Sequence, residues 1–455
     1  MATALQKQLA VIAANSTHQL DLKAQKQRHS KSLLFEPRDA ATQSFDTIFQ
    51  TCYEGFEELC MLDSRFTPFA HNLFSEQSKD EDRTQMTVKE NEELDKILQT
   101  FLGLVCGRLL LKPAMSAVEW LVRRFRVQEY NIEWTLLTFL PYHGSHIFPT
   151  LMSILPEELP ATFRFLNPYV ASLQSPPRHA ILSAAIGNQA FFTALSQYVL
   201  SVSRSNHHSM VLLGFWASIT AQAVNGMIDS TRSGRDNIRK QREEDLLLRV
   251  LPVLQSTISI KGVQELYLGS CMIMTILATK ATLEDNVLDA MMEVVAAGWN
   301  EDTMTEGITC LAVLAEEKQN VSQPQRVTKA LLRSINALDC LRELSKHQRV
   351  SKLTLLTAVG ILNRSSQLFD VEDVRNLVAV VDMGLLTEHH FAVLLDHLFP
   401  VAQGLKSNGP LTESWKALSG FLTNIADLEA NSEVLARVAQ TTGVSLASLD
   451  LTDLG

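Results

Sequence analysis

The sequence predicts an all-α fold, in the form of an α-solenoid of stacked HEAT-like helical hairpins. Apolar residues recur at helical spacing along nearly the whole chain. No alternating apolar–polar run bounded by hairpin turns interrupts this pattern. Helices without strands form either a compact bundle or a solenoid. The chain has 455 residues, more than the roughly 250–300 that one core usually serves, so stacked hairpins are favoured over a bundle.

Two helices are marked most clearly, one near each end of the chain. The first follows a turn at 37–44, and its apolar stripe consists of Phe45, Ile48, Phe49, Cys52, Phe56, Leu59 and Cys60. The second stripe consists of Trp415, Leu418, Phe421, Leu422, Ile425 and Leu428. Between them, helical segments of about 10–20 residues are separated by short polar or Gly/Pro joints. Helix pairs recur at roughly 35–47 residues, as in HEAT and armadillo repeats.

A helix predicted over 117–127 has two faces. Its apolar face consists of Val118, Leu121, Val122 and Phe125. Trp120 points the opposite way, between Arg123 and Arg124, and Glu119 is spaced to pair with Arg123. Arg124 lies one turn further on, where its guanidinium can stack over the indole. We favour packing of Trp120 on the next helical layer over base stacking or partner contact, which remain alternatives.

Within a single array spanning 1–455, three segments break the helical rhythm. We expect an amino-terminal helix and a basic extended segment over 1–44, an acidic flexible loop over 76–92, and a charged loop over 229–245. The basic residues that could contact RNA phosphates or a partner are Lys23, Lys26, Arg28, Lys31, Arg232, Arg235, Arg239, Lys240 and Arg242. The alternative for both clusters is a solvated surface without a binding role.

Composition limits the classes of function. Hydrophobic residues make up 46% of the chain and charged residues 20%, which is typical of folded proteins. The net charge of −10 argues against a uniformly basic nucleic-acid binder. Six scattered cysteines without a C-x-x-C pair indicate a reducing compartment. Residues 210–228 are uncharged, but their polar side chains favour a helix buried in protein, so we expect no membrane partner.

The sequence contains none of the common catalytic motifs. A phosphate-binding P-loop, a dinucleotide-binding glycine pattern, H-E-x-x-H and G-x-S-x-G are all missing. The histidine pairs at 207–208 and 389–390 are adjacent, whereas ligands on a helix are usually spaced i, i+4. We therefore expect a protein that is not an enzyme and has no cofactor, metal site or small-molecule substrate.

Three segments carry a family resemblance. Ser32–Asp46, Asn72–Glu76 and Val118–Phe125 resemble the amino-terminal region of the family of U-three small nucleolar RNA-associated protein ten. The family markers, which look structural, are Pro37, Trp120, Arg123, Arg124 and Phe125. The motif resemblance is specific over about 1–170, and beyond that only the helical pattern agrees. Members are several times longer, so the chain is expected to be an amino-terminal part of a longer protein.

The resemblance implies a non-enzymatic scaffold in the nucleolus, within the nucleus. The family is the HEAT-repeat subunit of the UTP-A subcomplex of the small-subunit processome. It would dock other UTP-A subunits, including WD-repeat propeller proteins, during early pre-ribosomal RNA processing and small-subunit assembly. Direct binding of the 5′ external transcribed spacer through basic loops stays open, as does a solenoid of the transport-receptor kind.

Overall fold

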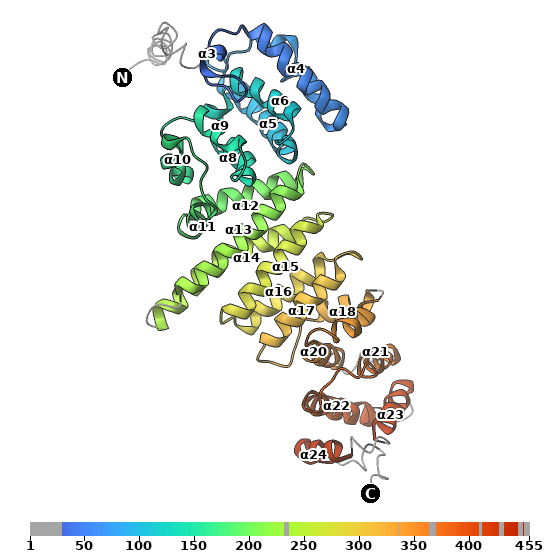
Figure 1. Ribbon diagram of the computed structural model, residues 1–455. Helices are drawn as coiled ribbons and strands as arrows, with labels where there is room; N and C mark the ends of the chain where they lie inside the picture. Colours follow the sequence, from blue (N-terminus) through green and yellow to red (C-terminus); the bar gives the residue numbers. More distant parts are fainter. Residues whose placement is uncertain are drawn as a thin grey trace, which may run out of the picture. The chain divides into compact units, whose positions relative to one another are not determined.

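The computed structural model describes residues 30–231, 236–334, 336–363, 370–408, 412–426, 432–444 and 449. Throughout these ranges the regular structure is α-helical or 3₁₀-helical, and they contain no strand. The prediction of an all-α fold is therefore confirmed (Figure 1). The chain divides into two compact units, Met1–Met227 and Ile228–Gly455, which are described in turn.

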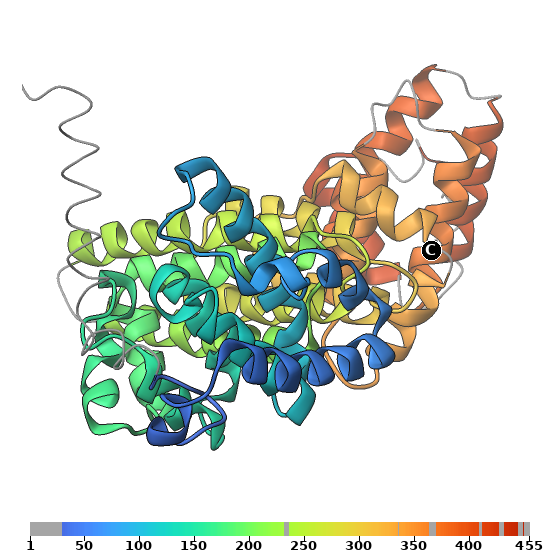
Figure 2. The same cartoon turned by 90° about the horizontal axis from the view of Figure 1, so that it is seen from above.

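The first unit combines long helices with short helical turns (Figure 2). Its elements are α3 (Pro37–Ala40), α4 (Phe45–Leu62), η1 (Ser64–His71), η2 (Glu76–Lys79), α5 (Val88–Val105), η3 (Cys106–Arg108), α6 (Lys112–Arg123), α7 (Val127–Tyr130), α8 (Ile132–Phe139), η4 (Leu140–Tyr142), α9 (Ile147–Ile154), η5 (Ala161–Leu166), α10 (Asn167–Ser172), α11 (Arg178–Gly187), α12 (Gln189–Arg204) and α13 (Met210–Thr231), whose last turn crosses into the second unit.

Side-chain caps set the starts of the two long helices that precede α6 in the chain. The Ser44 side chain accepts a hydrogen bond from the Thr47 amide at the start of α4. Thr87 and Glu90 form a reciprocal capping box at the start of α5. Such caps satisfy amide groups that have no partner within the helix. The helix predicted from the stripe that begins at Phe45 therefore starts at that residue.

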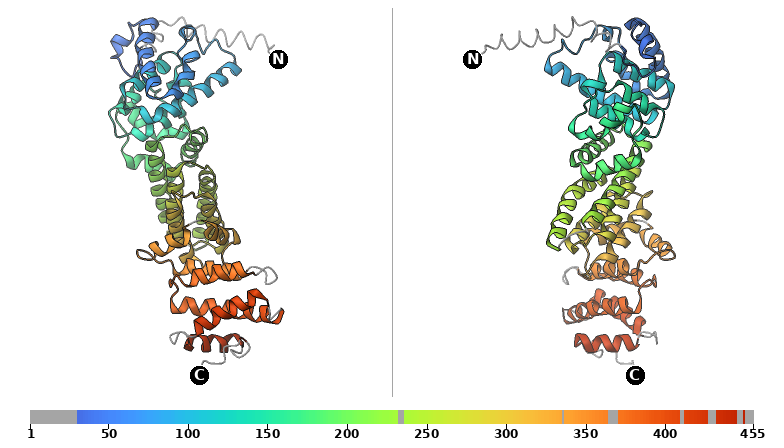
Figure 3. Two further views of the ribbon diagram at one scale, coloured as in Figure 1. Left: turned by 90° about the vertical axis from the view of Figure 1, so that its right-hand side faces the viewer. Right: turned by 60° about the vertical axis from the view of Figure 1, so that its left-hand side comes forward.

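The second unit consists of longer and more regular helices (Figure 3). Its elements are α14 (Asp236–Ile258), α15 (Gln264–Lys280), α16 (Asp285–Gly298), α17 (Met304–Glu317), α18 (Gln325–Arg333), α19 (Ala337–Leu344), α20 (Ser351–Leu362), α21 (Val371–Val381), α22 (Glu388–Asn408), α23 (Glu413–Ala426) and α24 (Ser432–Thr442).

Packing in the second unit follows a ladder along the chain. Helix α15 packs on α17, α17 on α20, α20 on α22 and α22 on α24. In a parallel row, α14 packs on α16, α16 on α18 and α21 on α23. Each of these helices thus contacts neighbours within three elements in sequence, which is the quasi-one-dimensional arrangement of a solenoid. The prediction of stacked helical hairpins is confirmed.

Two predicted loops differ in the structure. Over 76–92, residues Glu76–Lys79 form η2, α5 begins at Val88, and the Arg83 side chain is buried between them. Over 229–245, α13 continues to Thr231 and α14 begins at Asp236, so most of this segment is helical. The many charged residues of both segments made them look like loops in the sequence. A single buried arginine organises the first segment, and an Arg239–Glu243 pair at i, i+4 spacing supports the second.

The apolar helix α13 is long and apolar enough, by length and composition alone, to cross a membrane. Its most apolar window is 67% buried within the protein, and Leu212, Trp216 and Val224 are fully inaccessible. Such burial is typical of a core helix. The structure thus places this segment as the sequence predicted.

Candidate functional site

The helix α6 is enclosed on all sides. Every residue from Ala114 to Arg123 is buried, including the charged Glu119 and Arg123. Buried polar groups need hydrogen-bond partners, because an unsatisfied group costs free energy of folding. The partners of α6 side chains show what this helix holds in place.

Trp120 joins α6 to two other segments. Its indole nitrogen donates a hydrogen bond to the main-chain oxygen of Leu73 at 2.8 Å. Its ring meets Phe49 edge-on at 4.9 Å and Phe45 at 6.4 Å between centroids. The ring is fully buried, so it contacts the α4 layer and is not an exposed stacking platform for a base. Next to it, Gly55 lets α4 approach α6, because a Cβ there would lie 2.6 Å from the Ser116 Cβ.

Glu119 holds the extended segment that precedes α3. One carboxylate oxygen accepts a hydrogen bond from the Ser32 hydroxyl at 2.6 Å, and the other accepts one from the Leu33 amide at 2.6 Å. Burial raises the pKa of Glu119, while these hydrogen bonds and Arg123 act in the opposite direction. The Arg123 guanidinium lies 4.0 Å from the Glu119 carboxylate. The predicted ion pair is therefore present, but both of its side chains are buried.

The two arginines of α6 bind main-chain oxygens in separate segments. Arg123 donates to Ala40 at 2.8 Å, and Arg124 donates to Ser78 at 3.1 Å. The Arg124 guanidinium lies over Phe45 at 5.1 Å, so the expected stacking over the indole is wrong. The spacing of residues within one helix could not identify Phe45 as the partner of Arg124, because Phe45 belongs to a different helix, α4.

The three motif segments therefore meet around one helix. Ser32–Asp46 contacts α6 through Glu119 and Arg123, and Asn72–Glu76 contacts it through Trp120. The remaining markers fit the same arrangement, because Pro37 occupies the first position of α3 and Phe125 is fully buried. This cluster, defined by Glu119, Trp120, Arg123 and Arg124, is called the α6 anchor below. The polar groups of this cluster bind other segments of the first unit and thereby stabilise its fold.

The basic residues predicted to bind RNA or a partner are placed only in part. Lys23, Lys26, Arg28, Arg232 and Arg235 lie outside the described residues. In the first unit, Lys31 is half-buried, its amino group donates to the Leu155 carbonyl at 3.5 Å, and burial lowers its pKa. In the second unit, Lys240 and Arg242 are exposed on α14, whereas Arg239 lies 3.9 Å from Glu243.

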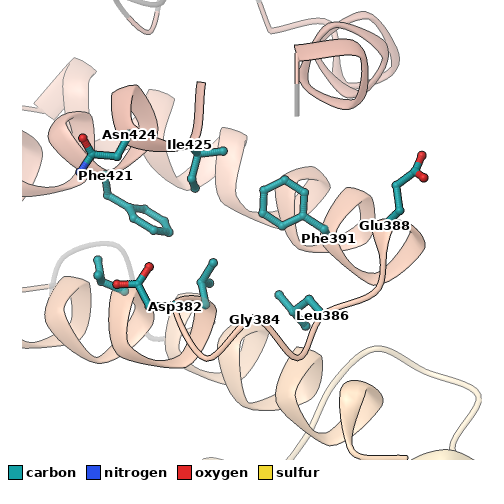
Figure 4. Close-up of a pocket in the computed structure, with 10 residues that line it drawn as sticks. Asp382, Gly384, Leu386, Glu388, Phe391, Phe421, Asn424 and Ile425 are labelled. Atoms are coloured by element: carbon teal, nitrogen blue, oxygen red, sulfur yellow. The ribbon is translucent and has the colours of Figure 1, made fainter. Parts of the chain in front are cut away.

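A cleft of about 600 Å³ lies between α21, α22 and α23 (Figure 4). Phe391 and Phe421 line it together with aliphatic side chains, and Asp382 and Glu388 supply carboxylates. Gly384, in the turn between α21 and α22, has a φ of +67°, a conformation that favours glycine. The sequence pattern did not predict this cleft, because only Gly384 marks the turn.

Two ion-pair networks of the first unit were also missed. Arg83 pairs with Asp95 and donates to Asn131 at 2.7 Å. Asp63 lies between Arg65 at 2.7 Å and Arg108 at 2.6 Å, and hydrogen bonding to Arg65 lowers the pKa of Asp63 to about 2. Within the described ranges, no group of three or more metal-binding side chains converges.

Comparison with known proteins agrees with the motif resemblance and extends it. The family model of U3 small nucleolar RNA-associated protein 10 matches residues 246–361, within the second unit. A protein of that name from Neosartorya fischeri is 45% identical over 454 residues, which cover 100% of this chain and 25% of the relative. Another from Coccidioides immitis is 44% identical over 99% of this chain and 25% of its own length.

A third relative of the same name, from Aspergillus oryzae, is 50% identical over 388 residues, which cover 85% of this chain and 22% of the relative. The similarity thus reaches well beyond the first 170 residues to which we had limited it. The chain spans about a quarter of the length of these curated relatives. Along its whole length the chain is similar to proteins named U3 small nucleolar RNA-associated protein 10, and residues 246–361 match the model of that family.

Proposed function

We propose that the chain is a non-enzymatic scaffold in ribosome biogenesis. In this role it docks protein subunits of the UTP-A subcomplex, WD-repeat propeller proteins among them, during early pre-ribosomal RNA processing in the nucleolus. The observation that carries the proposal is the identity of about 45% along the whole chain to proteins named as associated with U3 small nucleolar RNA. None of the relatives reported above is named as an enzyme or a transport receptor.

The structure supports a scaffold role through its architecture. In a solenoid, every added hairpin enlarges the surface while the core stays local, so several modest contacts can act together. The four side chains of the α6 anchor each hydrogen-bond to another segment of the first unit, so the anchor serves the interior and is not itself a docking surface. The cleft beside Phe391 adds an apolar recess with carboxylates at hand.

Retention of purified UTP-A subunits by the immobilised chain tests the docking role. We expect at least one subunit to remain bound at low and at moderate salt, because apolar contacts resist screening. Loss of every subunit at both salt concentrations would contradict the role. A fluorescent fusion of the chain, expressed with the other subunits, tests nucleolar accumulation.

Direct contact with the 5′ external transcribed spacer is the second candidate, and the exposed Lys240 and Arg242 on α14 favour it. Affinity for spacer RNA is to be measured at several salt concentrations. Phosphate contact predicts a log–log slope of about −0.7 for each phosphate neutralised on a single strand. A slope near zero, or an unchanged slope after Lys240→Ala and Arg242→Ala, would show that these residues do not contact RNA phosphates.

A further inference from the structure

Six large apolar side chains of the first unit are exposed at the ends of helices. Two of them are the last residues of α4, two directly precede α6, and two are the first residues of α13 (Figure 1). These residues, called the apolar patch below, are Met61 (85% exposed), Leu62 (61%), Leu110 (58%), Leu111 (43%), Met210 (72%) and Val211 (44%). Across the described ranges thirteen large apolar side chains are exposed, so nearly half of them lie at these three helix ends. Clustered exposure of this kind marks interaction sites, whereas single exposed side chains are ordinary.

Direct contacts join the three helix ends beside the patch. Each contact involves a residue within two positions of a patch residue or in the turn that leads to one. They are the Asp63–Arg108 ion pair at 2.6 Å, the hydrogen bond from Arg65 to the Asn206 carbonyl at 2.9 Å, and the approach of Ser209 to within 2.8 Å of a Cβ built on Gly107. These contacts bring together the three helix ends that carry the six side chains.

The segments around the patch carry a small net positive charge, although the chain as a whole carries −10. Segments 57–66, 104–112 and 204–214 contain four basic residues, Arg65, Arg108, Lys112 and Arg204, and three acids, Glu57, Glu58 and Asp63. Asp63 is shared between Arg65 and Arg108. The exposed Lys112 and Arg204 keep their charge available at the α6 and α13 ends of the patch, whereas the acids Glu57 and Glu58 flank its α4 end.

We propose that the apolar patch docks an acidic amphipathic helix of a partner protein. This inference rests on the proposed scaffold function and deepens it by naming the surface and the chemistry of the partner. An amphipathic helix presents an apolar stripe with charged residues along both flanks. Leucine and methionine side chains adapt their shape to such a stripe. Acidic flanks complement the exposed Lys112 and Arg204, and a basic helix meets repulsion from these two residues.

Binding of labelled peptides to the full chain tests the partner chemistry. The probes are two helical peptides of about 20 residues with the same leucine stripe, one flanked by glutamates and the other by lysines. We expect the acidic peptide to bind, and the variant Met61→Ser/Leu110→Ser/Met210→Ser to bind it about tenfold more weakly. Equal binding by wild type and variant, or tighter binding of the basic peptide by wild type, would overturn the inference.

Two further variants serve as controls. Val88→Ser/Leu248→Ser removes side chains that are 78% and 76% exposed outside the patch, so acidic-peptide binding is expected to stay unchanged. Lys112→Glu/Arg204→Glu is expected to weaken the acidic peptide and favour the basic one. An unchanged Tm for each variant verifies folding, because exposed side chains contribute little to stability. No effect of the charge reversal would refute the electrostatic part of the inference.

The subunit-retention experiment separates this inference from the function on which it rests. If wild type and the triple serine variant retain the same UTP-A subunits to the same extent, the docking function stands and the patch is not its surface. If wild type retains none while the acidic peptide binds through the patch, the proposed function fails and the patch remains a binding surface.

Discussion

The indole nitrogen of Trp120 donates a hydrogen bond to the main-chain oxygen of Leu73, 47 residues earlier, at 2.8 Å. This contact ties the central helix α6 to a segment without regular structure. Because the donor is fully buried, the carbonyl is its only substitute for water. The residue that looked like a possible ligand platform in the sequence thus serves the interior of the first unit.

Replacing Trp120 is expected to reduce stability before it affects binding. Trp120→Ala removes a fully buried indole and should lower the free energy of unfolding by about 3–5 kcal/mol. Trp120→Phe keeps an aromatic ring against Phe49 but leaves the Leu73 carbonyl without its donor, which costs about 1–3 kcal/mol. Thermal and denaturant unfolding measure both. A variant of normal stability that has lost subunit retention would show instead that Trp120 contacts a partner.

Glu119→Gln is expected to loosen the segment at Ser32 and Leu33. The carboxylate accepts through both oxygens, whereas an amide offers one oxygen and turns a donor toward the other partner. The expected loss is about 1–3 kcal/mol. Glu133→Gln, on an exposed residue of α8, is the matched control and should change stability by less than about 0.5 kcal/mol. Similar unfolding midpoints for the two variants would contradict the role of Glu119.

The sequence predicted the fold class, the α4 stripe and the buried face of α6, because helical periodicity is local information. It could not predict the partners of Glu119, which lie 86 and 87 residues away in the chain. It also placed a flexible loop where the buried Arg83 bonds to Asn131 and Asp95. The composition of residues 76–92 shows their acidic side chains, but it does not show that the segment packs around the buried Arg83.

The predicted basic residues show the same limit for the candidate site. Their charge suggested phosphate contact, yet Lys31 is half-buried and donates to the Leu155 carbonyl. The apolar patch went unnoticed because Met61, Leu110 and Met210 each look like ordinary core residues in their own segment. Only tertiary contacts show that these residues lie at neighbouring helix ends.

Gly55→Ala is expected to destabilise the first unit, although alanine is the better helix former. A Cβ at this position would lie 2.6 Å from the Ser116 Cβ and 3.0 Å from the Pro113 carbonyl oxygen, so α4 and α6 must separate. The expected cost is about 1–3 kcal/mol. Gly214→Ala, in α13, meets no atom within 4 Å and should instead stabilise by about 0.5–1 kcal/mol. If denaturant unfolding showed stability changes of the same sign for the two variants, the close approach of α4 and α6 would be disproved.

Asp63 is expected to make stability depend on pH below neutrality. Its pKa is about 2 in the folded protein, because Arg65 and then Arg108 favour the carboxylate, whereas an unfolded aspartate titrates at about 3.9. The unfolded chain therefore binds the proton first as pH falls, and the stabilisation, complete at neutral pH, is lost progressively below about pH 5. Glu119 has a raised pKa and acts in the opposite sense, so the difference in unfolding free energy between wild type and Asp63→Asn isolates the effect. That difference should shrink between about pH 5 and pH 3, and a constant difference would show that the arginines do not hold Asp63 ionised.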